Sequence, residues 1–159
     1  MLVVCVTLSA EDGYLISGPD IITRGFVYVR ESEELIDEMR RRPDVDPDRV
    51  YLMGESLGAY TVWQLAMSRP EWFSAIVPIC GGGITWSANR LVNLNVWAFH
   101  GALDTTVYPE CSVRMVETIN KCGGHAKLTL YEDRDHDEWT PAMTDDATWD
   151  WIFSQTKAG

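Results

Sequence analysis

The Gly-x-Ser-x-Gly pentapeptide GESLG, at residues 54–58, has the residue types and spacing for nucleophilic chemistry. A nucleophilic serine needs a tight turn that lifts its hydroxyl clear of the backbone, and flanking glycines let strand and helix approach without Cβ clashes. The preceding VYLM is a strand candidate, and the following AYTVWQLAMSRP is a helix candidate. This strand–turn–helix context predicts that Ser56 is a nucleophile rather than an incidental serine between two elements.

Serine is an effective nucleophile only when an imidazole accepts its proton and an acid orients that imidazole. The chain has three histidines. His100 ends an apolar strand, where a buried structural role is the simpler interpretation, and His125 lies in a glycine-rich turn that should be exposed. His136 follows the last predicted strand, in a loop that can reach the carboxyl edge of the sheet. The sequence therefore favours His136 as the base.

Asp104 is the predicted orienting acid, because it follows an apolar strand and lies at the same carboxyl edge. Asp135 and Asp137 flank His136 in sequence, but side chains of neighbouring residues in an extended loop diverge. The predicted chain order is therefore serine, aspartate, histidine, which is the order of one large class of hydrolases.

Alternating strands and helices make up the second part of the chain, which implies a parallel sheet with helices on both faces. The expected strands are 50–53, 75–80, 96–100 and 127–131, and the expected helices are 57–68, 109–121 and 145–155.

The first part of the chain predicts a β-hairpin over 2–17, a strand at FVYVR and a helix over 33–41. A right-handed βαβ unit would place FVYVR beside the strand VYLM, with the hairpin at the edge. We therefore expect one α/β domain over residues 1–159, a three-layer sandwich with a mainly parallel sheet and an N-terminal β-hairpin at its edge.

The composition narrows the possible partners. The formal charge is −11 and no large basic cluster is present, which disfavours nucleic acid as a partner. The four cysteines form no C-x-x-C pair, so we expect no metal and no cofactor. No segment approaches the roughly 20 apolar residues of a membrane span, so we expect no membrane partner and a cytoplasmic location. The oligomeric state is left open.

A family resemblance covers residues 43–159. The stretches VDPDRVYLMGESLGAYTVWQLAMSRPEWFSAIVPICGGG, VWAFHGALDTTVYPE and HDEWTPAMTDDATWDWIFSQ resemble α/β-hydrolase-fold serine esterases of the dienelactone hydrolase and phospholipase/carboxylesterase-like group, including predicted peptidases. The resemblance implies a truncated α/β-hydrolase fold. It also implies that Ser56 is the nucleophile, Asp104 the acid and His136 the base, with the Leu57 N–H as one oxyanion donor.

Residues 1–42 resemble a different family, a stretch of the ribonuclease J C-terminal domain, so the chain looks like a chimera. None of that family's metal-binding histidine motifs is present, and ribonuclease activity does not carry over. The oxyanion loop that usually precedes the serine in α/β-hydrolases is also missing. A backbone N–H from residues 31–33 is one candidate for the oxyanion donor that this loop would supply, because the N-terminus of a helix presents unpaired N–H groups.

Two functions follow from these features. The first is a carboxylesterase that cleaves small acyl esters through an acyl-enzyme, with no cofactor. The connection over residues 81–94 leaves no room for a lid domain, and Trp86 and Trp139 are candidate substrate-binding residues, although packing is an equal alternative for each. The second is a folded but catalytically weak scaffold or interaction module that lacks a complete oxyanion hole.

Overall fold

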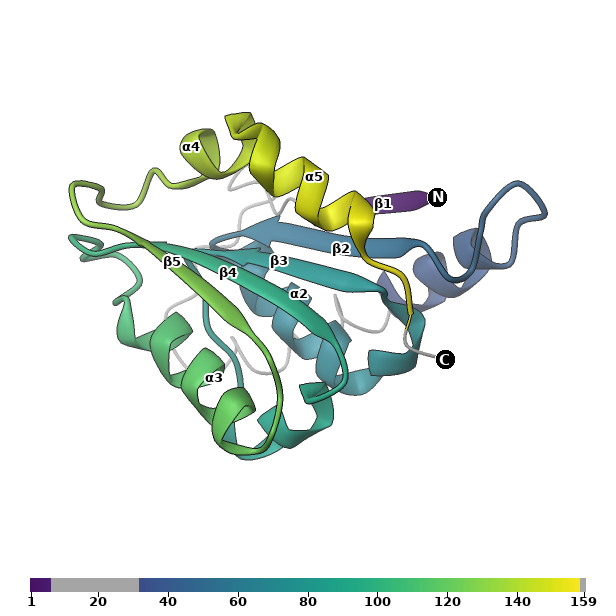
Figure 1. The fold of residues 1–159 in the computed structure, drawn as a ribbon, viewed down its shortest axis with the longest axis horizontal. Coiled ribbons are helices and arrows are strands. Elements are labelled where there is room, and N and C mark those ends of the chain that lie inside the picture. The colour runs from purple at the N-terminus through teal and green to yellow at the C-terminus, as the bar shows by residue number, and fades with distance from the viewer. Residues whose placement is uncertain (7–31, 158–159) are drawn as a thin grey trace.

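The computed structural model describes residues 1–6 and 32–157, and within this part five strands form one parallel sheet (Figure 1). The strands follow one another across the sheet in chain order, which is typical of strands joined by helical crossovers. They are β1 (Leu2–Val6), β2 (Val50–Glu55), β3 (Ala75–Ile79), β4 (Asn95–Gly101) and β5 (Lys127–Tyr131).

The helices cover both faces of this sheet, as Figure 1 shows. Helices α2 (Leu57–Ser68) and α3 (Glu110–Lys121) lie on one face, and α4 (Trp139–Thr144) and α5 (Asp146–Ser154) lie on the other. Two 3₁₀ helices, Pro70–Trp72 and Thr85–Leu91, complete the connections, and residues 32–40 are helical. The expected three-layer α/β architecture is therefore confirmed.

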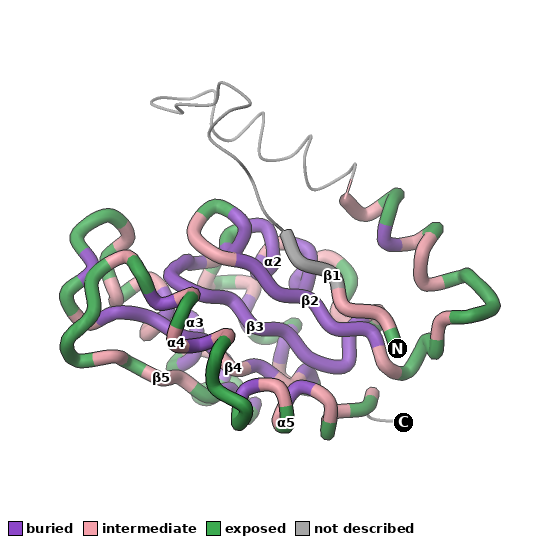
Figure 2. Tube along the Cα trace, turned by 90° about the horizontal axis from the view of Figure 1, so that it is seen from above, coloured by how far each residue is buried: buried purple, intermediate pink, exposed green. Residues whose placement is uncertain are grey.

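Strand β2 shows why the strands are continuously apolar rather than alternating. Val50 and Leu52 are buried in one core cluster, together with residues of α2 and α3. Tyr51 and Met53 point the other way, into a second cluster that includes Ile152 of α5. A parallel strand with helices on both faces must be apolar at every position. Figure 2 shows the result, with β2 and β3 buried along their length.

The predicted elements of the second part of the chain are all present, and the structure adds one short helix. The helix expected over 145–155 is preceded by a separate short helix, α4. Asp145 ends α4 in an extended conformation, and its side chain then accepts a hydrogen bond from the Ala147 N–H at 2.9 Å. This N-cap starts α5 as a new helix.

The prediction that the segment FVYVR lies beside β2 is wrong. Strand β1, not FVYVR, pairs in parallel with β2, from Leu2 opposite Val50 to Val6 opposite Gly54. Strand β3 occupies the other side of β2, so no edge remains for FVYVR. Leu2 and Val3 are half-buried and pack against the first and the second core cluster respectively, so β1 contributes apolar side chains to both faces of the sheet.

Strand β1 lies at the edge of the described sheet, where the N-terminal hairpin was expected. The turn and second strand of that hairpin, and the segment FVYVR itself, lie outside the described residues. No helix in the described ranges has both the length and the apolar character that crossing a membrane requires.

Candidate active site

Ser56 is the single residue between β2 and α2, so the predicted strand–turn–helix context is confirmed. Its backbone has φ 54° and ψ −117°, a positive φ that non-glycine residues rarely adopt. Its N–H donates to the Ile79 carbonyl at 2.9 Å, which ties the turn to the neighbouring strand. Such a conformation persists only where the surrounding structure imposes it, and these positions are frequent at functional sites.

Gly81 permits this turn to sit against the loop after β3. A Cβ atom at Gly81 would lie 2.4 Å from the Cβ of Ala59 and 3.2 Å from the Ser56 carbonyl oxygen. Only a glycine lets the two backbones approach so closely. The loop after β3 therefore supports the serine from the side.

The structure brings the three sequence-predicted residues into one hydrogen-bonded chain. The Nε2 atom of His136 lies 3.0 Å from the Ser56 Oγ atom, and its Nδ1 atom lies 2.6 Å from Asp104 Oδ2. The Asp104 side chain is fully buried, whereas the His136 ring is one-quarter exposed. In this arrangement the Nδ1–H donates to the carboxylate, and Nε2 is free to accept the serine proton.

Backbone donors hold the Asp104 carboxylate in its ionised form. Its Oδ1 atom accepts hydrogen bonds from the N–H groups of Thr106 at 2.8 Å and Val107 at 2.9 Å. Burial acts to raise the pKa of Asp104, but the hydrogen bonds from His136 and these two amides outweigh it, and the pKa is lowered. A carboxylate that stays charged can stabilise an imidazolium beside it.

Gly101, at the end of β4, lets the loop after β5 reach Asp104. A Cβ atom there would lie 2.2 Å from the Asp135 carbonyl oxygen and 2.5 Å from that of Arg134. The Leu103 N–H donates to the Arg134 carbonyl at 2.9 Å, which fixes the loop in place. This packing places His136, the next residue in the loop, over the carboxyl edge of the sheet.

The other two histidines lie where the sequence predicted. His125 is exposed, and His100 is fully buried with both ring nitrogens bonded, Nδ1 to Ser112 Oγ at 2.7 Å and Nε2 to the Val107 carbonyl at 2.8 Å. Ser112 in turn donates to the Gly81 carbonyl at 2.8 Å. His100 thus links the loops after β3 and β4, which carry Gly81 and Asp104.

Two buried side chains near the His136–Asp104 pair escaped the sequence analysis, Cys80 and Glu138. Burial raises the pKa of the Glu138 carboxyl and also that of the Cys80 thiol. The available signal was their position, since each follows a strand that ends at the same edge of the sheet. Neither residue belongs to a recognisable sequence motif, and a position after a strand does not by itself distinguish Cys80 or Glu138 from a core residue.

The Leu57 N–H is the first donor of α2 and lies beside Ser56. The first N–H groups of a helix have no partner within it and lie at the positive end of its dipole. This amide therefore has the properties of an oxyanion donor.

The sequence predicts a backbone N–H from residues 31–33 as a candidate second oxyanion donor. This prediction is wrong for residues 32 and 33, which the structure describes. Glu33 accepts a hydrogen bond from the Ser68 hydroxyl and lies 3.6 Å from the Arg69 guanidinium. Ser68 is the last residue of α2, about 16 Å along the helix from Leu57. The start of helix 32–40 thus packs at the opposite end of α2 from the serine, and residue 31 lies outside the described residues.

The two candidate substrate-binding tryptophans lie in different environments. Trp86 is 84% exposed in the 3₁₀ helix Thr85–Leu91. Trp139 begins α4 and is half-buried, with its side chain packed against the second core cluster. Core packing therefore accounts for part of the Trp139 surface, whereas the Trp86 side chain is free.

Exposed apolar side chains flank the serine and the aspartate. Leu57 is 45% exposed and Leu103 is 59% exposed, and each is the neighbour in sequence of a residue in the hydrogen-bonded chain. Tyr60, one turn further along α2, and Tyr108 are also exposed. Large exposed apolar groups around a polar centre are typical of a site that binds a partly apolar ligand.

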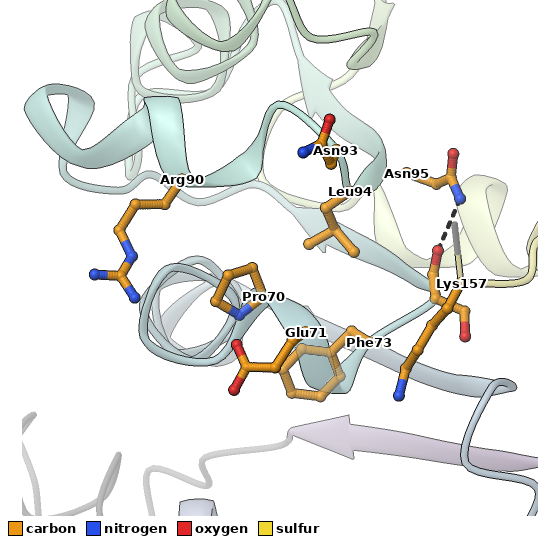
Figure 3. Close-up of a pocket in the computed structure, with 9 residues that line it drawn as sticks. Pro70, Glu71, Phe73, Arg90, Asn93, Leu94, Asn95 and Lys157 are labelled. Atoms are coloured by element: carbon orange, nitrogen blue, oxygen red, sulfur yellow. Dashed lines mark hydrogen bonds between the residues drawn. The ribbon is translucent and has the colours of Figure 1, made fainter. Parts of the chain in front are cut away.

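A separate cavity of about 280 Å³ lies at the opposite, amino edge of the sheet (Figure 3). Its lining includes Pro70, Phe73, Arg90 and Lys157, together with Asn95 at the start of β4. Figure 3 shows the Asn95 amide, which donates to the Ser74 carbonyl at 2.9 Å. The cavity therefore lies away from Ser56, at the other end of the strands.

Comparison with known proteins separates the chain into two parts. The family model for the ribonuclease J C-terminal domain matches residues 1–45. Ribonuclease J2 of Bacillus subtilis (strain 168) is 64% identical over 36 residues, which are 23% of this chain and 6% of that protein. Poly(3-hydroxyalkanoate) depolymerase C of Paucimonas lemoignei is 36% identical over 64 residues, which are 40% of this chain and 16% of that protein.

Solved structures match most of the chain. A thermostable esterase superposes with a TM-score of 0.78 and 29% identity, covering 81% of this chain and 37% of that one. The esterase PE8 superposes with a TM-score of 0.66 and 20% identity, covering 80% of this chain and 60% of that one, which supports the fold alone. The chain spans about a third of the thermostable esterase, and far less of the two relatives matched by sequence.

The fold and these likenesses define the class. The chain has the α/β fold of these solved structures, with five described strands in one parallel sheet. It joins this fold to an N-terminal segment that is similar to ribonuclease J, so the chimeric interpretation of the sequence is confirmed.

Proposed function

We propose that the protein is a serine hydrolase of the carboxylesterase type, which cleaves small acyl esters. The observation that carries this proposal is the hydrogen-bonded chain from Ser56 through His136 to Asp104. It is built on a serine with positive φ at a strand–helix junction. Three side chains from three separate connections meet in the geometry that general-base activation of a serine requires.

The reaction would proceed in two halves. Ser56 Oγ attacks the ester carbonyl carbon while its proton moves to Nε2 of His136, and Asp104 stabilises the imidazolium that forms. The negative oxygen of the tetrahedral intermediate accepts a hydrogen bond from the Leu57 N–H. The imidazolium then gives its proton to the departing alkoxide, which leaves as the alcohol. Water, activated by the same imidazole, attacks the acyl-enzyme and releases the carboxylic acid.

An ester with a short acyl group suits the surroundings of the serine. The connection after β3 is short, and the exposed side chains of Leu57, Leu103 and Tyr108 offer apolar contact. Trp86, which is free in solvent, and the exposed part of Trp139 are proposed to extend this surface. The likeness to a thermostable esterase and to a poly(3-hydroxyalkanoate) depolymerase supports an ester as the substrate class.

A catalytically weak scaffold is the second candidate function. The observation that favours it is the position of Glu33 at the far end of α2, because this leaves Leu57 without a second oxyanion donor from residues 32–34. Loss of one such donor typically lowers turnover by about 10²- to 10³-fold. Under this alternative the protein would fold, but would turn over esters slowly.

A fluorophosphonate probe followed by p-nitrophenyl acetate turnover separates the two candidates. The wild-type protein and a Ser154→Ala control, which changes an exposed serine in α5, should both be labelled, and Ser56→Ala should not. Labelling with measurable turnover supports the esterase. Labelling without turnover supports the weak scaffold, and equal labelling of Ser56→Ala would overturn the assignment of the nucleophile.

A further inference from the structure

Four side chains with metal-binding atoms meet beside the predicted base. Cys80, Asp104, His136 and Glu138 each offer one ligand atom, and these four atoms all lie within 4.8 Å of one another. They come from the connections that follow β3, β4 and β5. Their spacing in the sequence matches no metal-binding motif, so only the fold reveals the group.

Cys80 and Glu138 are the two members of this group that have no role in the proposed hydrolysis. Glu138 is fully buried, and apart from the Cys80 thiol and its own backbone N–H, neither of its carboxylate oxygens has a hydrogen-bond partner among the described residues. Buried polar groups in native proteins are almost always fully paired, so a buried carboxyl beside a weakly bonding thiol can take an ion as a further partner.

The Glu138 carboxyl occupies a space that β4 leaves open for it. A Cβ atom at Gly101 would lie 2.0 Å from Glu138 Oε1, so any larger residue there would displace the carboxyl. On the other side, the carboxyl is close to the buried Cys80 thiol. Glu138 is therefore held toward the other three side chains rather than turned toward solvent.

We propose that these four residues form a binding site for a borderline-soft divalent cation of the Zn²⁺ class. One thiolate, one imidazole and two carboxylates are ligands that Zn²⁺ takes in proteins, and four ligands match its tetrahedral preference. Mg²⁺ and Ca²⁺ require more oxygen ligands, and a site with sulfur and nitrogen disfavours them. Small shifts toward a central ion would close the tetrahedron.

Binding of the ion changes the protonation of Cys80 and His136, and the change at His136 determines the effect of the ion on hydrolysis. The Cys80 thiol loses its proton to solvent and forms the metal–sulfur bond. The Nδ1 atom of His136, which faces Asp104, binds the ion in place of its proton, and the ring then carries its proton on Nε2. That N–H donates to Ser56 Oγ and can no longer accept the serine proton. The ion therefore acts as an inhibitor. This inhibition rests on the proposed hydrolysis, but the binding of the ion does not depend on it.

The surface around the site favours the arrival of a cation. His136 is the only partly exposed member of the group, so the ion enters past its ring. The loop around it carries four exposed acidic residues, and the whole chain has a formal charge of −11. A concentrated negative field raises the local cation concentration and the rate of association. These acidic residues are Glu132, Asp133, Asp135 and Asp137.

Cobalt titration tests binding without reference to activity, since Co²⁺ reports both geometry and a thiolate ligand. We expect one Co²⁺ per chain, with the intense d–d bands of a tetrahedral ion and a thiolate-to-metal charge-transfer band. The charge-transfer band should vanish in Cys80→Ser and persist in Cys122→Ser, which changes an exposed free cysteine. An absent band in the wild type, or an unchanged band in Cys80→Ser, would overturn the site.

Zinc competition tests the Glu138 ligand and the inhibition. Zn²⁺ should displace Co²⁺, and Glu138→Gln, which keeps the shape of the side chain, should weaken Zn²⁺ binding by at least about 10-fold. In the wild type, esterase activity should fall as Zn²⁺ occupies the site. Equal Zn²⁺ affinity of Glu138→Gln, or full activity at saturating Zn²⁺, contradicts the proposal. If the protein binds Co²⁺ as expected but has no esterase activity, the proposed function is wrong and the metal site is supported.

Discussion

The Nε2 atom of His136 lies 3.0 Å from the Oγ atom of Ser56, although the two residues are 80 positions apart in the chain. The distance is within hydrogen-bond range without any bound ligand, so the imidazole is already placed to accept the serine proton.

Replacing the buried carboxylate should affect turnover far more than replacing an exposed one nearby. Asp104→Asn should lower esterase turnover by roughly 10³- to 10⁴-fold, because the amide no longer fixes the imidazole tautomer. Asp137→Asn is the matched control, since Asp137 is exposed and accepts a long hydrogen bond from Thr140 at 3.4 Å. Steady-state kinetics of both variants measures the effect, and equal losses would mean that the orienting acid is misassigned.

The close approach of Gly81 and Ala59 should make their substitutions interdependent. Gly81→Ala should lower the free energy of unfolding by about 1–3 kcal/mol, because the added Cβ would lie 2.4 Å from that of Ala59. The double variant Ala59→Gly/Gly81→Ala removes the clashing atom and should recover part of this loss. Urea denaturation of the two single variants and the double variant gives the coupling. Strict additivity would show that helix α2 and the loop after β3 do not press on each other.

Ser112 should contribute to stability through the two buried groups it satisfies. Ser112→Ala leaves Nδ1 of His100 and the Gly81 carbonyl without their shared partner, which should cost about 1–3 kcal/mol. Ser154→Ala changes an exposed hydroxyl and should cost no more than about 0.5 kcal/mol. Thermal and urea unfolding compare the two, and a loss of similar size in both would contradict the bridging role.

Tyr60 should titrate unusually late. The ring of Tyr60 is only partly exposed, and the burial of its remaining surface, followed by the neighbouring Cys111, raises the pKa of Tyr60 to about 12. Because the folded pKa lies above the unfolded value of about 10, the contribution of Tyr60 to stability is complete below about pH 10. It is lost as the pH rises through about 12. The ultraviolet titration of wild type minus Tyr60→Phe should show a midpoint near 12, and Cys111→Ala should lower that midpoint. A midpoint near 10 in the wild type would contradict the observed surroundings of the ring.

The sequence by itself determined the elements and the order of the reactive residues. The apolar run before Ser56, the small residues around it and the helical pattern after it are local features, so the strand–turn–helix junction could be predicted. His136 and Asp104 followed from a general property of parallel sheets, whose strands all deliver their next residues to one edge. The buried structural place of His100 followed from its apolar strand.

Only the tertiary structure decided which strand lies beside β2 and where the helix 32–40 begins relative to Ser56. The segments LVVCV and FVYVR are both apolar enough for a strand, and periodicity shows which faces of a strand are buried but not which strand it pairs with. The position of Glu33 beside Ser68, rather than beside Leu57, removed a predicted oxyanion donor. The meeting of Cys80 and Glu138 with the His136–Asp104 pair was likewise invisible in the sequence. It depends on how three loops pack around Gly101, and contacts between residues distant in the chain leave no local periodicity to recognise.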